Sequence, residues 1–117
     1  MGLDQYWFVK EPENEESVEI AYHRKFNALE GFMAQEAVNQ GIVEHSGNFN
    51  CVDLPITTEI LDRLQETIDS GSLTPTKGFF FGSLEIRKED LEYLEKVIKR
   101  AESHLKKGNA VVYTSWW

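Results

Sequence analysis

The pattern that most constrains the fold is an amphipathic helix close to the carboxyl end, followed at once by a strand. Between about Lys88 and Lys107, apolar residues recur at steps of three and four, which places them on one helical face. These residues are Leu91, Leu94, Ile98, Ala101 and Leu105. Acidic side chains lie early in this helix and basic ones late, as the helix dipole favours. Gly108 and Asn109 end the helix, and residues 110–117 read as a closing strand of high β propensity.

Two more helices are predicted from the same spacing. The first runs from about Val18 to Gln40 and ends at Gly41, with its apolar face formed by Tyr22, Phe26, Leu29, Met33 and Ala37. The second begins with Thr57 or Thr58 as its cap and ends at Ser70 and Gly71. Its apolar face consists of Ile60, Leu61, Leu64 and Ile68.

Strand signals are shorter. Residues 3–10 alternate loosely and are rich in aromatic and β-branched types, and residues 50–54 form a short candidate strand that Pro55 stops. The acidic run 11–17, between the first of these strands and the first predicted helix, reads as a solvated loop. Residues 73–83 read as an aromatic loop or strand, and they hold three consecutive phenylalanines. In an extended chain these three cannot all face one core, because successive side chains alternate between faces.

The order of these elements favours one economical architecture. We expect a single domain, 1–117, of the α+β class, because the chain has the commonest size of one domain. A small sheet of three or four strands would bring the first and last strands side by side, with three helices packed mainly on one face.

Charge and cysteine content exclude several classes of function. Twenty acidic residues against twelve basic ones give a net charge of −8, which repels phosphate backbones and argues against general nucleic-acid binding. The same charge would suit docking on a basic surface, although many proteins are acidic for solubility alone. The single cysteine, Cys51, allows no intramolecular disulfide, and no apolar run is long enough to span a membrane. We therefore expect a cytoplasmic protein that does not engage membranes.

No familiar catalytic or cofactor pattern occurs. Phosphate-binding glycine loops are missing, and the three histidines and Cys51 lack the close spacing of metal ligands. We expect no metal, no cofactor and no catalytic residue. A buried, inert Cys51 is favoured over a Cys51 nucleophile paired with a histidine.

The segment 22–27 is the strongest candidate for a binding site, because it places basic and titratable groups together in an acidic half of the chain. On a helix, His23, Asn27 and Glu30 would line one strip with Arg24 beside it, able to grip an anion. The alternative is a solvated flank in which Arg24 and Lys25 pair with Glu16, Glu19 or Glu30. Together with the phenylalanine run, the predicted ligand-binding residues are Tyr22, His23, Arg24, Lys25, Asn27, Phe79, Phe80, Phe81 and Ser83.

Four separated segments of the chain resemble a family of small proteins encoded mainly by bacteriophages and prophages. They are the opening Met-Gly-Leu-Asp-Gln-Tyr, the segment 22–29, Gly-Phe-Phe-Phe-Gly-Ser at 78–83, and Ser115-Trp116. The resemblance implies a phage accessory protein, cytoplasmic in the infected bacterium, and implies no reaction. In that family a histidine often follows the Arg-Lys-x-Asn segment, whereas Glu30 stands near that place here. A mechanism that needs a histidine at position 30 is therefore not implied.

Three hypotheses of function remain. The leading one is a non-enzymatic binding protein that acts on a host or defence component, because an aromatic-rich loop accompanies an acidic surface. The second is a binder or sequestering protein for an anionic small ligand such as a nucleotide, held by Arg24, Lys25 and Asn27 with stacking on Phe79 to Phe81. The third is a small hydrolase, which we favour least. Trp116, Trp117 and the phenylalanine run leave room for a homodimer.

Overall fold

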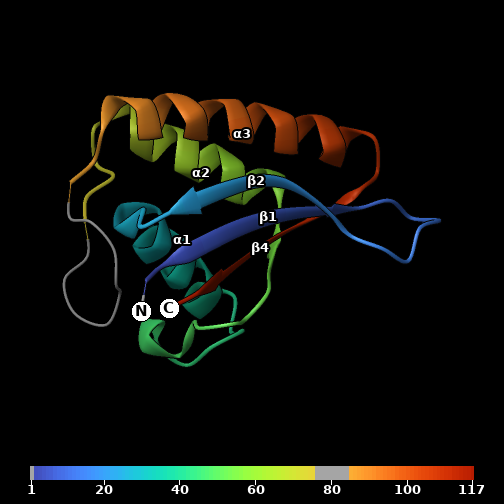
Figure 1. Cartoon of the computed structure of the whole chain (residues 1–117), viewed down its shortest axis with the longest axis horizontal. Coiled ribbons are helices and arrows are strands. Elements are labelled where there is room, and N and C mark those ends of the chain that lie inside the picture. The colour runs from blue at the N-terminus through green and yellow to red at the C-terminus, as the bar shows by residue number, and fades with distance from the viewer. Residues whose placement is uncertain (1, 76–84) are drawn as a thin grey trace.

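A computed structural model describes residues 2–75 and 85–117, and within them it shows a four-stranded sheet and three α-helices (Figure 1). The elements follow one another as β1 (Asp4–Lys10), β2 (Val18–Arg24), α1 (Asn27–Asn39), a short 3₁₀ helix η1 (Ser46–Asn48), β3 (Leu54–Ile56), α2 (Thr58–Asp69), α3 (Lys88–Lys106) and β4 (Ala110–Trp116). The α+β class predicted from the sequence is confirmed. None of the helices in these residues is long and apolar enough to cross a membrane.

The sheet is antiparallel throughout, with strand order β2-β1-β4-β3. The first and last strands are central and pair along their whole length, from Asp4 opposite Trp116 to Lys10 opposite Ala110. β3 pairs only with β4, and β2 pairs with β1 through a register shift after Trp7. The expectation that the ends of the chain meet in one sheet is therefore correct.

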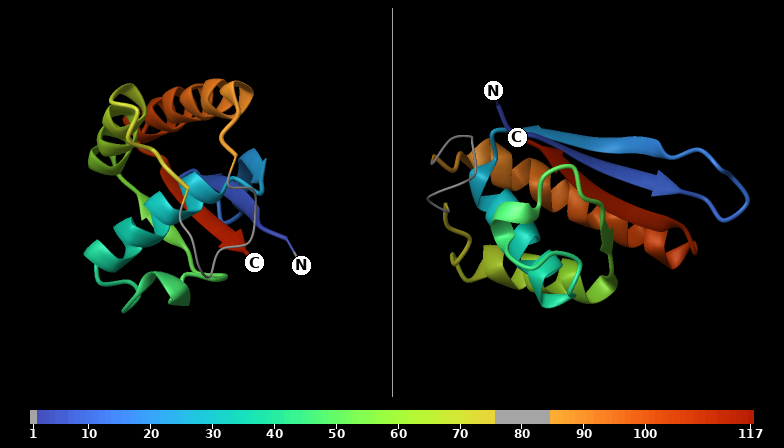
Figure 2. Two further views of the ribbon diagram at one scale, coloured as in Figure 1. Left: turned by 90° about the vertical axis from the view of Figure 1, so that its left-hand side faces the viewer. Right: turned by 90° about the horizontal axis from the view of Figure 1, so that it is seen from below.

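Within the described residues, all three helices lie on one side of the sheet and none covers the other side (Figure 2). In β1 the burial alternates strictly, with Gln5, Trp7 and Val9 buried and Tyr6 and Phe8 half-buried. The buried set joins the apolar faces of the helices in a single core. Alternation of this kind is what a sheet with one covered face requires.

The long first helix predicted from residue 18 is wrong in its first third. Residues 18–24 form β2, and α1 begins only at Asn27. The apolar step of three and four holds from Phe26 onward, whereas Val18 and Ile20 are β-branched and give a hairpin partner to the aromatic strand β1. Tertiary pairing with β1 thus decides the structure of this segment.

The other helix predictions are close to the structure. Thr57 caps α2, since its Oγ1 accepts the Ile60 N–H at 3.2 Å, and α3 ends within one residue of its predicted end. The predicted strand 50–54 is displaced: β3 starts at Leu54 and includes Pro55, which fits an exposed position on an edge strand. The prediction for residues 76–83 lies outside the described residues.

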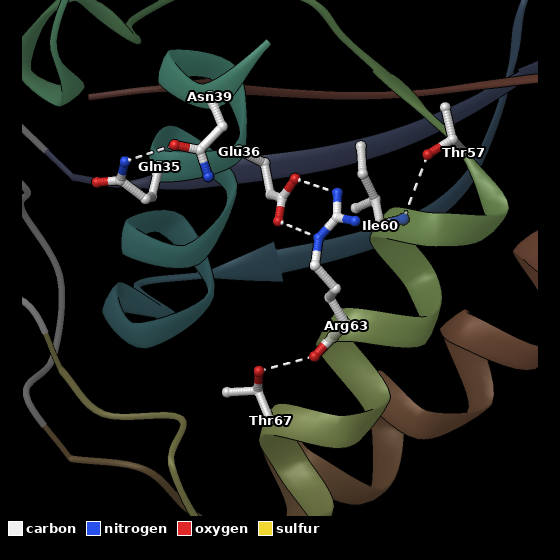
Figure 3. A network of polar contacts seen from close by, with 7 residues as sticks. All are labelled: Gln35, Glu36, Asn39, Thr57, Ile60, Arg63 and Thr67. Carbon is white, nitrogen blue, oxygen red and sulfur yellow. Dashed lines mark hydrogen bonds and ion pairs between the residues drawn. The ribbon is translucent and has the colours of Figure 1, made fainter.

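A bidentate ion pair fastens α1 to α2 (Figure 3). Arg63 donates from Nε to Glu36 Oε2 at 2.9 Å and from Nη2 to Glu36 Oε1 at 2.7 Å. The Glu36 side chain is almost completely buried, while half of the Arg63 side chain is exposed. Arg63 thus neutralises the buried Glu36 carboxylate at the contact between α1 and α2.

Candidate functional site

The turn between β2 and α1 carries two of the predicted ligand-binding residues, Arg24 and Lys25. Lys25 has φ of +59°, a left-handed conformation that costs a non-glycine residue about 1–2 kcal/mol. Neighbouring groups hold it there: the Lys25 N–H donates to the Leu3 carbonyl at 2.8 Å, and the buried Gln5 amide bonds both the N–H and the carbonyl of Phe26. These hydrogen bonds to Leu3 and Gln5, at the start of β1, therefore hold Lys25 in its strained conformation.

A buried polar cluster lies directly behind this turn. Glu30 is fully buried and accepts three hydrogen bonds, from the Tyr113 hydroxyl at 2.7 Å, the Ser115 hydroxyl at 2.6 Å and the Trp117 indole N–H at 3.1 Å. Gln5 Nε2 in turn donates to the Tyr113 hydroxyl at 3.0 Å. Burial raises the pKa of Glu30 to about 7, against the three donors, which lower it. The cluster ties α1 to β4 and does not open to solvent.

His23 and Asn27, which were predicted to bind a ligand, do not lie on the surface. Both are buried, at 6% and 1% exposure, because His23 points inward from β2 and Asn27 begins α1 under the sheet. His23 Nε2 accepts the Trp7 indole N–H at 3.1 Å, and burial lowers the pKa of His23 to about 4. The predicted strip of His23, Asn27 and Glu30 thus forms part of the interior.

Arg24 and Lys25 remain exposed and line a cleft of about 240 Å³ at the start of α3. The cleft is also lined by Glu85, Arg87 and Asp90. Asp90 caps α3 by accepting the Arg87 N–H at 3.3 Å. Within the described residues, neither Arg24 nor Lys25 forms an ion pair, so the alternative in which they pair with Glu16, Glu19 or Glu30 does not hold there. Three basic and two acidic residues thus line one concave surface, and its guanidinium groups can accept an anion.

A second surface, which the sequence did not predict, lies on the uncovered side of the sheet. Tyr6 contacts three other rings, with centroid distances of 6.0 Å to Phe8, 5.3 Å to Tyr22 and 5.5 Å to Trp116. Trp116 is 56% exposed and Tyr22 40% exposed. We call Tyr6, Phe8, Tyr22 and Trp116 the outer aromatic face. Such a cluster of exposed and half-buried rings is typical of a surface that binds a partner or ligand.

The cleft and the outer aromatic face adjoin each other along β2. Tyr22 and Arg24 are two residues apart on this strand and project from the same side. Their partners on β1 are Tyr6 and Asp4, and the Tyr22 hydroxyl donates to the Asp4 carboxylate. Tyr22, which the sequence placed in the site, therefore belongs to the rings, and Arg24 borders them.

The sequence held a usable signal for the outer aromatic face. In residues 4–10 two sets of large side chains alternate, one being Trp7 and Val9 and the other Tyr6 and Phe8. Two apolar sets on one strand mean that both faces of that strand carry rings, and only one face can be covered by three short helices. Trp116 belongs to the outer aromatic face because β4 places it opposite Asp4. No local sequence pattern encodes that pairing.

The remaining predicted site residues, Phe79, Phe80, Phe81 and Ser83, lie outside the described residues. In residues 2–75 and 85–117, no group of three histidine, cysteine or acidic side chains could hold a metal ion. Cys51 is exposed rather than buried as expected. Comparison of the chain with protein-family models, with curated proteins and with solved structures finds no match.

Proposed function

We propose that this chain is a non-enzymatic binding protein that recognises a protein partner through the outer aromatic face. The observation that carries the proposal is the contact of Tyr6 with Phe8, Tyr22 and Trp116, on the side of the sheet that none of the described helices covers. Tyrosine and tryptophan are enriched among the residues that dominate interface energies. The family resemblance directs attention to a host or defence component of an infected bacterium as the partner.

Binding is favoured over catalysis by where the titratable groups lie. Glu30 and His23 have strongly shifted pKa values, as catalytic acids and bases often do, but both are sealed in the core. Their shifts come from burial and their hydrogen bonds go to other core residues. A substrate in solution would not reach them.

The test is capture of a stoichiometric partner from bacterial lysate by the wild type and by two variants. Trp116→Ser should lower partner affinity about 30-fold, corresponding to the roughly 2 kcal/mol typical of a central interface tryptophan. Ile42→Ser is the matched control, because Ile42 is also an exposed large apolar residue but lies in the loop after α1. The proposal fails if no partner is recovered, or if both variants retain it equally.

A second candidate function is binding of an anionic small ligand in the cleft of Arg24, Lys25 and Arg87. Its support is a cleft with three basic and two acidic lining residues, one of which, Lys25, has a strained backbone, since such strain concentrates at ligand sites. The guanidinium groups of Arg24 and Arg87 could bind the phosphate of a nucleotide or inorganic phosphate bidentately, and Lys25 would add a point charge.

Thermal unfolding with added nucleotides, cyclic dinucleotides and inorganic phosphate tests the cleft. A ligand at about 100 times its dissociation constant stabilises the fold by about 2.7 kcal/mol. Lys25→Gly should abolish that shift, while the variant without ligand gains up to about 1 kcal/mol because glycine tolerates the left-handed backbone. Lys99→Gln, an exposed lysine on α3, controls for the loss of charge and should keep the shift. If none of these ligands raises the unfolding temperature, this candidate function is ruled out.

A further inference from the structure

The rings of the outer aromatic face are arranged around Tyr6. Phe8 stacks beside it with an interplanar angle of 21°, while Tyr22 and Trp116 are tilted by 50° and 54°. Tyr6 is the ring that contacts all three of the others, and it remains half-buried among them. Ring faces of this kind carry a negative quadrupole that attracts cations.

Two carboxylates act on the same ring. On β1, Asp4 is two residues before Tyr6 and projects from the same side. On β2, Glu19 lies opposite Phe8 of β1. Burial raises the pKa of Tyr6, and so do the nearby charges of Asp4 and Glu19. Both charges that raise the pKa of Tyr6 are therefore negative, whereas Arg24 acts on the neighbouring Tyr22.

These carboxylates are left for an external cation. Among the described residues, ion pairs are formed only by Arg63 with Glu36 and by Lys88 with Glu92, so Asp4 and Glu19 have no ion-pair partner there. Arg24 and Lys10 also project from this side, but at the ends of the strands, and Arg24 lies opposite Asp4 without an ion pair between them. The strand positions next to Tyr6 that the structure describes, Asp4, Phe8, Tyr22 and Thr114, carry no cation.

The charge of the whole chain selects among occupants. Two copies of a chain with a net charge of −8 repel each other, and so do this chain and a nucleic acid. A basic protein segment is attracted at long range and can desolvate its cation on the rings at short range. Arginine suits the place best, because its planar guanidinium both stacks on a ring and offers a fork of donors to a carboxylate.

We infer that the outer aromatic face is a docking site for a basic segment of a protein partner, with an arginine side chain lying on Tyr6 between the carboxylates of Asp4 and Glu19. This inference rests on the proposed function and names the chemistry of the partner. Phe8 and Trp116 supply the apolar contact around the guanidinium, and Tyr22 holds Asp4 in place through its hydroxyl.

Selection from a displayed library of random peptides tests the inference, with removal of peptides that also bind a Tyr6→Ser/Trp116→Ser double variant. We expect the surviving peptides to be enriched in arginine. The strongest one, made synthetically, should bind Asp4→Asn/Glu19→Gln about tenfold more weakly than the wild type, and its binding should weaken as salt is added. Asparagine can still accept the Tyr22 hydroxyl, so the fold is kept.

The control for overall charge is Glu13→Gln/Glu15→Gln, in the exposed loop between β1 and β2. It also removes two negative charges, but not beside the rings, and should retain most of the peptide affinity. Equal loss in both double variants would show that only the net charge matters and would overturn the docking geometry.

The remaining outcomes separate this inference from the proposed function. Ring-dependent peptides without basic residues would overturn the inference and leave the proposed function standing. Recovery of no ring-dependent peptide would count against both. Sedimentation that shows a dimer lost in the Tyr6→Ser/Trp116→Ser variant would make a second copy the occupant and would also overturn it.

Discussion

Two buried titratable side chains, Glu30 and His23, are tuned in opposite directions by the same cause. Burial penalises the charged form, which raises the pKa of Glu30 to about 7 and lowers that of His23 to about 4. The partners agree with a neutral His23, because its Nε2 accepts the Trp7 N–H and so cannot also carry a proton. At Glu30 three donors oppose burial without overcoming it.

These two shifts predict opposite contributions to stability in one pH window. The contribution of Glu30 is complete below its usual pKa of 4.5 and is lost as the pH rises through about 7. The contribution of His23 is complete above its usual 6.5 and is lost as the pH falls through about 4. Each changes the free energy of unfolding by about 3 kcal/mol, since one unit of pKa shift corresponds to about 1.4 kcal/mol.

Urea unfolding between about pH 4.5 and about pH 6.5 checks this balance. Relative to the wild type, Glu30→Gln should become more stable as the pH rises, because only the His23 term remains. His23→Gln, which keeps an acceptor for Trp7, should become less stable over the same range. Two variants with the same pH slope as the wild type would show that neither group is buried in the form described.

At the scale of elements, the sequence predicts correctly the helices whose structure is decided by their own local pattern. The helices α2 and α3 combine apolar faces with caps that lie in the sequence itself, at Thr57 and Gly108. The strand β2 was missed because its structure depends on pairing with β1 and on a left-handed Lys25, and neither leaves a local signal. For the same reason the predicted strip of His23, Asn27 and Glu30 on one helix does not form, and His23 and Asn27 are buried while Arg24 and Lys25 are exposed.

The pair Glu36–Arg63 predicts an asymmetric response between α1 and α2. Arg63→Met should cost about 1–3 kcal/mol, because it leaves the buried Glu36 carboxylate without its partner. Glu36→Met should cost less, because Arg63 is half exposed and can be solvated. The double variant should recover most of the loss.

A double-mutant cycle from chemical unfolding measures this coupling. The matched control is the exposed pair Lys88–Glu92 in α3, at 3.8 Å, for which coupling under about 0.5 kcal/mol is expected. Equal coupling in the two cycles would contradict a special role for the buried carboxylate.

For the whole molecule, β4 is the strand on which assembly depends. It pairs with β1 and β3, and it supplies Tyr113 and Ser115 to the cluster around Glu30. β3 has no other strand neighbour. The sheet therefore forms only when residues 4–10 meet residues 110–116, which are at opposite ends of the sequence.

A chain that ends at Asn109 should consequently lack cooperative unfolding and show reduced helical circular dichroism, because isolated helices as short as α1 and α2 are marginal in water. Adding a synthetic peptide of residues 108–117 should restore both signals. The same peptide with Tyr113→Lys, which puts a charge into the core, should not. Native-like unfolding of the shortened chain would contradict the central role of β4.

The bond from the Trp117 indole to Glu30 gives the protein an optical reporter of its own interior. The indole N–H donates a bifurcated hydrogen bond, to Glu30 Oε2 at 3.1 Å and to the Phe49 carbonyl at 3.2 Å. When the carboxylate gains or loses its proton, the electric field along that N–H changes, and the emission of this tryptophan should shift with it. The ionisation of a group that no solvent touches can thus be followed by fluorescence in the unmodified chain.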